Sequence, residues 1–177
     1  MERGSLYSWV AACAALLAGC NHDTSGRTTL RQAAEAFVPQ DASERIVAPN
    51  LPWVQISFNI RRPWLQFAFD ENRIKEAKLA GWGLCRPANA EWDGYEDHAA
   101  TPPNYRRLRT YVLYKDGVLL QLIGIYDTPL ETMGLGKRDE KPVQQGIVIA
   151  RRTTPKEALQ MAANFQLSCD MRAEDHR

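Results

Sequence analysis

LRTYVLY (residues 108–114), KDG (115–117) and VLLQLIGIY (118–126) together form the stretch that decides the fold. Its two outer runs are rich in β-branched and aromatic residues, and Asp116-Gly117 lies between them. This dipeptide between such runs is typical of a tight β-hairpin turn. The stretch therefore predicts two antiparallel strands at the centre of a sheet.

Further strands are indicated on both sides of this hairpin. In residues 53–60, apolar residues alternate with polar ones toward the end of the run, which is typical of a half-buried strand. Residues 146–152, centred on Ile147-Val148-Ile149, and the short run 82–85 predict two more strands. In the run 53–60, the side chains expected to face the core are Val54, Ile56, Phe58 and Ile60.

Helix signals lie outside the strands. Residues 30–37 follow a capping Thr29 and precede Pro39, Asp70-Glu71-Asn72 opens a helix that runs to about Ala80, and Gly81 supplies its stop. The residues expected to be buried are Leu30, Ala33, Ala34 and Phe37 in the first helix and Ile74 and Ala77 in the second.

The last helix has the strongest start signal. Thr154-Pro155-Lys156-Glu157 combines a threonine cap, proline at the first position and a glutamate that completes a capping box. The helix is predicted over 155–165, with Leu159, Ala162, Ala163 and Phe165 near its buried side. The fold class expected is α+β: a mostly antiparallel sheet of four to five strands with two or three helices.

Two irregular segments, 86–104 and 127–144, interrupt this pattern. Long loops in compact domains are often functional, and aromatic residues dominate binding energetics. Segment 86–104 is therefore the first candidate for a recognition surface; ordinary packing is the alternative for its aromatic residues. The predicted partner-binding residues are Trp92, Asp93, Tyr95, Glu96 and Asp97. Near His98 we expect a solvated acidic loop rather than a cation site, because the spacing matches no EF-hand or zinc pattern.

The N-terminus carries an export signal. Arg3 and the apolar run 8–17 precede Leu17-Ala18-Gly19-Cys20, and this run is too short to span a bilayer. Leu17-Ala18-Gly19-Cys20 resembles the lipobox of bacterial lipoproteins; a chance cysteine after an apolar N-terminus is the alternative.

The lipobox resemblance implies a membrane anchor. Cleavage would remove residues 1–19, and Cys20 would carry diacylglycerol and an added acyl chain such as palmitate. Asn21, where the family uses Asp for retention at the inner membrane, favours the outer membrane. Residues 20–29 would then be a lipidated tether and 30–177 a single periplasmic domain.

Two cysteines remain after this processing. Cys85 and Cys169 are an even pair in an oxidising compartment, which predicts one disulfide. Two unpaired buried thiols are the alternative.

The sequence shows no catalytic constellation. The formal net charge of +1 gives no reason to expect nucleic acid as a partner. No Gly-x-Ser-x-Gly motif is present, and Gly134-Leu135-Gly136-Lys137 lacks the remaining residues of a phosphate loop. The doublets Arg61-Arg62, Arg106-Arg107 and Arg151-Arg152 are expected to be solvated strand ends. We therefore expect a chain that is not an enzyme and uses no cofactor or metal.

The architecture resembles the small immunity lipoproteins encoded beside toxins of contact-dependent and type VI secretion systems, including those that guard against phospholipases. The resemblance implies a protein-binding inhibitor whose partner is a secreted antibacterial effector. The alternative is an accessory lipoprotein of envelope assembly or of a secretion machine. An enzyme acting on cell wall or lipid would need a pocket holding His98, Asp93 or Glu96.

Overall fold

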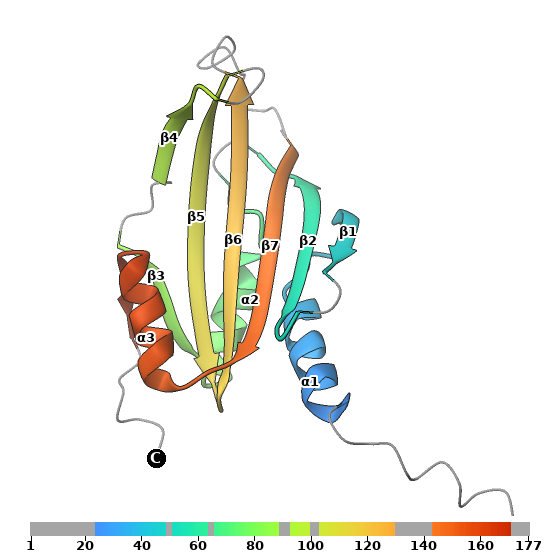
Figure 1. The fold of residues 1–177 in the computed structure, drawn as a ribbon, viewed down its shortest axis with the longest axis vertical. Coiled ribbons are helices and arrows are strands. Elements are labelled where there is room, and N and C mark those ends of the chain that lie inside the picture. The colour runs from blue at the N-terminus through green and yellow to red at the C-terminus, as the bar shows by residue number, and fades with distance from the viewer. Residues whose placement is uncertain are drawn as a thin grey trace, which may run out of the picture.

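In the computed structural model the described residues form one eight-stranded antiparallel sheet with helices on both faces (Figure 1). The structure describes residues 24–48, 51–63, 66–88, 93–99, 103–129 and 143–170. The elements in these ranges are α1 (Thr24–Glu35), β1 (Ser43–Val47), β2 (Val54–Arg61), α2 (Glu71–Leu79), β3 (Gly83–Pro87), β4 (Asp93–Asp97), β5 (Asn104–Lys115), β6 (Val118–Pro129), β7 (Val143–Arg152), α3 (Pro155–Asn164) and β8 (Leu167–Cys169).

The predicted central hairpin is confirmed as β5 and β6. The two strands pair without interruption from Lys115 and Val118 at the turn to Asn104 and Pro129 at the far end. Asp116 and Gly117 have φ angles of +48° and +76°. Positive φ at both central residues is the geometry of a type I′ hairpin turn, so this dipeptide fixes the register between β5 and β6.

The strand order is β1-β2-β7-β6-β5-β3-β8, and β4 also pairs with β5. β3 pairs with residues 112–114 of β5, and β4 pairs with residues 104–108. The two short strands therefore pair one after the other with the same edge of β5.

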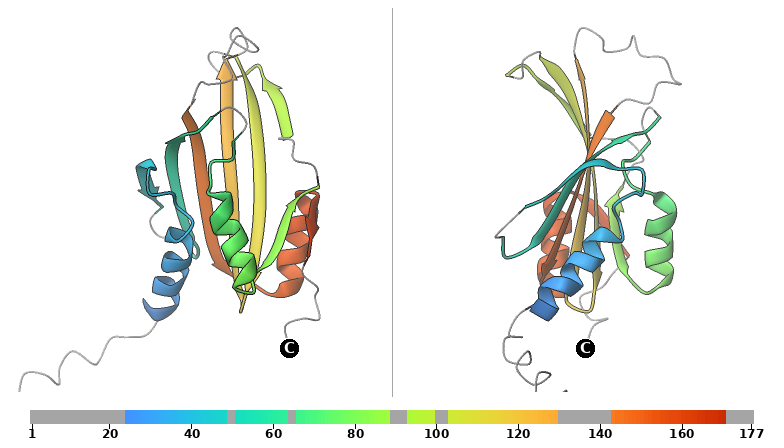
Figure 2. Two further views of the ribbon diagram at one scale, coloured as in Figure 1. Left: turned by 180° about the vertical axis from the view of Figure 1, so that it is seen from behind. Right: turned by 90° about the vertical axis from the view of Figure 1, so that its right-hand side faces the viewer.

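One face of the sheet is covered by α1, α2 and residues 66–69. This is the face that Figure 2, left, presents, with α2 in front of the strands. Phe58 of β2 lies directly over Gly146 of β7, where an added Cβ would come within 2.1 Å of the ring. The predicted inward side chains Ile56, Phe58 and Ile60 are all buried here. The cluster also holds Leu30, Ala34, Phe37, Phe67, Phe69, Ile74, Ala77, Leu113, Leu120, Leu122 and Val148.

The other face is covered at one corner by α3. Ala158 and Ala162 of α3 pack against Val112, Tyr114 and Leu119, and the predicted disulfide between Cys85 and Cys169 is present beside them. The two cysteines are directly paired residues of β3 and β8. The disulfide therefore ties the strand that follows α3 to the sheet.

The predicted caps of α2 and α3 are confirmed. The Asp70 side chain accepts a hydrogen bond from the Asn72 N–H, and Gly81 has a φ of +85° just beyond α2. Thr154 and Glu157 form the reciprocal capping box. The expectation that Ala163 and Phe165 are buried is wrong, because Ala158 and Ala162 set the packed side of α3 and leave those two residues exposed.

Several elements differ from the sequence predictions. The sheet has eight strands rather than four or five, because β1, β4 and β8 are short strands in segments without an alternating pattern. α1 begins at Thr24, inside the stretch 20–29 that we expected to be a tether. Packing of Leu30 and Ala34 stabilises this helix although its first turn has no acidic residue.

Candidate functional site

The predicted recognition segment contains a strand instead of a continuous loop. Asp93, Tyr95, Glu96 and Asp97 lie in β4, which pairs with residues 104–108 of β5, while Trp92 lies outside the described residues. Pairing with β5 supplies backbone hydrogen bonds that the sequence pattern did not reveal. Three of the five residues of β4 are acidic. β4 is thus a charged border of the sheet.

Only part of the β4 chemistry can be described. Glu96 is exposed, and its carboxylate lies 3.1 Å from Nε2 of the exposed His98. Among the described residues, no group of three or more His, Cys, Asp or Glu side chains is placed to hold a metal ion. The side chains of Asp93, Tyr95 and Asp97 lie outside the description, as do Cys20, Asn21 and residues 130–142.

The arginine doublets do not converge. Neighbouring residues in a strand point to opposite faces, so Arg106 and Arg107 separate. Arg106 forms a two-pronged ion pair with Asp127 at 2.8 and 3.0 Å, whereas the Arg107 guanidinium lies 5.2 Å from the centre of the Tyr105 ring. Arg151 donates to the Met161 sulfur at 3.8 Å. The doublets therefore do not make a common anion site.

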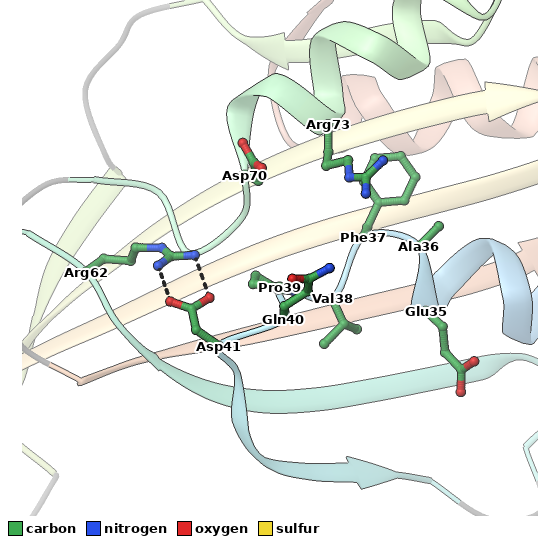
Figure 3. Close-up of a pocket in the computed structure, with 10 residues that line it drawn as sticks. All are labelled: Glu35, Ala36, Phe37, Val38, Pro39, Gln40, Asp41, Arg62, Asp70 and Arg73. Atoms are coloured by element: carbon green, nitrogen blue, oxygen red, sulfur yellow. Dashed lines mark hydrogen bonds and ion pairs between the residues drawn. The ribbon is translucent and has the colours of Figure 1, made fainter.

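A hollow of about 490 Å³ lies between α1 and α2 (Figure 3). Its central contact is an ion pair in which Arg62 donates to both Asp41 oxygens, at 2.7 and 3.3 Å. This hydrogen bonding with Arg62 lowers the pKa of Asp41. Glu35, Asp70 and Arg73 also line the hollow, so charges of both signs are present. Because Arg62 is already engaged, the hollow does not select an ion of one sign.

A polar cluster centred on the buried Arg109 lies on the covered face. The Arg109 guanidinium lies 5.9 Å from the centre of the Phe67 ring and 3.9 Å from the Glu71 carboxylate. Burial raises the pKa of the neighbouring Tyr111, although the positive charge of Arg109 acts in the opposite direction. These contacts link Phe67 and the start of α2 to β5.

The face opposite α1 and α2 carries an aliphatic surface that no described helix covers. Figure 1 looks onto this face, with α3 beside β5 over β3 and with β6 and β7 unobstructed. Cross-strand register places Ile123 opposite Ile147 and Ile125 opposite Leu108, with Ile149 in the neighbouring row. All five side chains are half-buried. We call Leu108, Ile123, Ile125, Ile147 and Ile149 the aliphatic stripe.

The border of the aliphatic stripe is more exposed and partly charged. Val143, on the same side of β7, is 47% exposed, and Ile46 of β1 is 66% exposed. The Arg106–Asp127 pair and the strand β4 lie at the β5 side. An apolar centre with a polar rim is the usual anatomy of a protein-binding surface.

Sequence reasoning missed this surface, although the sequence contains its signal. Ile147-Val148-Ile149 and Leu122-Ile123 are continuous apolar runs, so they place aliphatic side chains on both faces of an antiparallel sheet. A sheet with one solvated face shows alternation instead. The even positions of β7 are buried under α1, and the odd positions Ile147 and Ile149 remain half-buried on the other side.

Comparison of the chain with protein-family models, with curated proteins and with solved structures finds no match. Among the described residues, no helix combines the length and apolar character that crossing a membrane requires.

Proposed function

We propose that this chain is a lipid-anchored periplasmic protein-binding module, and most specifically an immunity protein that neutralises a secreted antibacterial effector, with phospholipases among the candidate effectors. The observation that carries the proposal is the aliphatic stripe on the open face of the sheet. Contiguous apolar side chains with a charged border favour a protein partner over a small polar substrate.

The energetics of the stripe favour binding by contact area. Each Å² of apolar surface that a partner removes from water contributes about 25 cal/mol of favourable free energy. The stripe residues project from three adjacent strands of a rigid hydrogen-bonded sheet, so little conformational entropy is lost when a partner covers them. The acidic strand β4 lies next to the stripe and would steer a basic partner surface toward it.

The proposed location rests on the N-terminal sequence and on the disulfide. Leu17-Ala18-Gly19-Cys20 supports lipidation at Cys20, and Asn21 favours the outer membrane. The disulfide between Cys85 and Cys169 is of the kind that persists in oxidising compartments such as the periplasm. Both observations support a domain that acts outside the cytoplasm.

The test is a competition between sister cells. Cells that lack the gene, mixed with the parent strain under conditions that allow contact, should be killed, and a plasmid copy of the chain should restore survival. Equal survival of deletion and parent cells would refute the immunity role.

The alternative role, in envelope assembly or in a secretion machine, is favoured by one feature. β4 pairs only with β5 among the described strands, so its outer edge offers backbone groups to an added strand. This role predicts that deletion increases sensitivity to detergents and large antibiotics when no competitor is present. Unchanged envelope permeability would rule it out.

A further inference from the structure

The start of α1 limits how far the domain can lie from a lipid anchor. α1 begins at Thr24, four residues after Cys20. A fully extended chain spans at most about 3.5 Å per residue, so the first turn of α1 lies within about 14 Å of a lipidated Cys20. The domain is therefore held close to the membrane by its α1 end.

The same end of the molecule carries the β5–β6 turn and the end of α2. Figures 1 and 2 draw the first turn of α1 and this turn at one end of the long axis. Nζ of Lys115, beside the turn, donates to the Ala80 carbonyl at 2.6 Å, which fixes the last turn of α2 there. Arg152 pairs with Val118, so the end of β7 lies there too.

This end of the molecule presents one exposed apolar residue together with basic and acidic side chains. Leu79, the last residue of α2, is 89% exposed. We define the membrane end as Leu79 with the basic residues Lys78, Lys115, Arg152 and Lys156. Lys78 is paired with Asp170, and Asp116 and Glu157 are the other acidic residues nearby in the chain.

We propose that the membrane end contacts the lipid headgroups, with Leu79 inserted in the interfacial region and the strands standing along the membrane normal. An exposed leucine can insert among lipid headgroups while the aliphatic stem of a neighbouring lysine is buried and its charge lies near phosphates. The inference rests on the proposed lipidation of Cys20. Because β7 is ten residues long, the inference places the start of β7 roughly 33 Å farther from the bilayer than its end.

This orientation gives the open face a defined position. The strands that carry the aliphatic stripe rise from the membrane, so the stripe is directed sideways into the periplasm and remains accessible to a partner. The other end of the sheet, where β4 and Val143 lie, is directed away from the bilayer.

The test uses the mature lipidated chain in vesicles of phosphatidylethanolamine and phosphatidylglycerol. Leu79→Cys and Val143→Cys each provide one reactive thiol, because in the mature lipidated chain Cys13 is removed, Cys20 carries the lipid, and Cys85 and Cys169 are joined. Both positions are exposed, so both variants should fold. A fluorophore at position 79 should be quenched by headgroup spin-labelled lipid at least about threefold more than one at position 143.

Three outcomes separate this inference from the proposed function. Strong quenching at position 79 in protein that floats with the vesicles supports the orientation. Flotation with equal quenching at the two positions overturns the orientation but does not contradict the proposal of an anchored binding module. Failure to float, with no lipid on Cys20 by mass spectrometry, overturns both the anchor and the orientation.

Discussion

The contact between Phe58 and Gly146 constrains the packing on the covered face of the sheet. The Phe58 ring occupies the space where any side chain at position 146 would lie, with ring atoms 2.1 to 2.7 Å from an ideal Cβ. Gly146→Ala should therefore lower the free energy of unfolding by about 1–3 kcal/mol, measured by urea denaturation, because the core is overpacked.

A double variant provides the control for this contact. In a Phe58→Leu background the smaller side chain leaves room, so the additional cost of Gly146→Ala should shrink. Strictly additive costs of the two substitutions would contradict the proposed contact.

Asp170 makes the stability depend on pH. Partial burial acts to raise its pKa, but hydrogen bonds from Lys78 and the Leu84 N–H outweigh burial and lower the pKa below its ordinary value. A carboxyl with a lowered folded pKa stabilises the protein above its unfolded pKa, about 3.9, and loses this contribution as pH falls through the folded value.

Asp170→Asn should therefore cost up to about 1 kcal/mol at neutral pH, because the partly exposed ion pair with Lys78 is lost while an amide oxygen can still accept from Leu84. The difference from the native chain should begin to shrink as pH falls below about 3.9 and should disappear below the lowered pKa of Asp170 in the folded chain. Urea titrations at several pH values measure it. A difference that persists unchanged in acid would show that packing, not charge, is responsible.

At the level of elements, the start of α3 depends on its capping box. Thr154 Oγ1 accepts from the Glu157 N–H at 3.3 Å, and the Glu157 carboxylate accepts from the Thr154 N–H at 2.9 Å. Thr154→Ala should lower the free energy of unfolding by about 1 kcal/mol. Thr154→Ser is the matched control and should retain most of the stability. Equal losses in both variants would contradict the capping role.

Elements with strong local signals were predictable from sequence. The Asp116-Gly117 turn, the Asp70 cap and the Thr154–Glu157 box each fix backbone geometry within a few residues, and all three are present. β1, β4 and β8 were not predictable, because these strands are held by pairing with β2, β5 and β3 rather than by their own pattern.

At the scale of the whole molecule, the disulfide links β3 to β8. The bond joins residues 84 positions apart and holds the end of the described chain to the sheet. The Cys85→Ala/Cys169→Ala variant should lose about 4 kcal/mol of unfolding free energy. Thermal denaturation of the oxidised native chain and of this variant measures the loss. A change below about 1 kcal/mol would show that the packing of α3 alone holds this corner.

The candidate surface depends on topology, which the sequence did not predict. Continuous apolar runs in 118–126 and 146–152 place aliphatic side chains on both faces of the sheet, and which face stays open is decided by where α1, α2 and α3 pack. The predicted residues of β4 lie at the border of the aliphatic stripe rather than at its centre.

The most direct test of the proposed role of the aliphatic stripe is rescue of deletion cells in competition with sister cells. The variants are Ile147→Glu and Val143→Glu, on the open face, and Phe165→Glu, on α3 and 43% exposed, as the matched control. Each must first be shown to unfold at a temperature close to that of the native chain. Survival rescued by the native chain and the control, and lost with both open-face variants, is the predicted result. Full rescue by both open-face variants would contradict a partner-binding role for the aliphatic stripe.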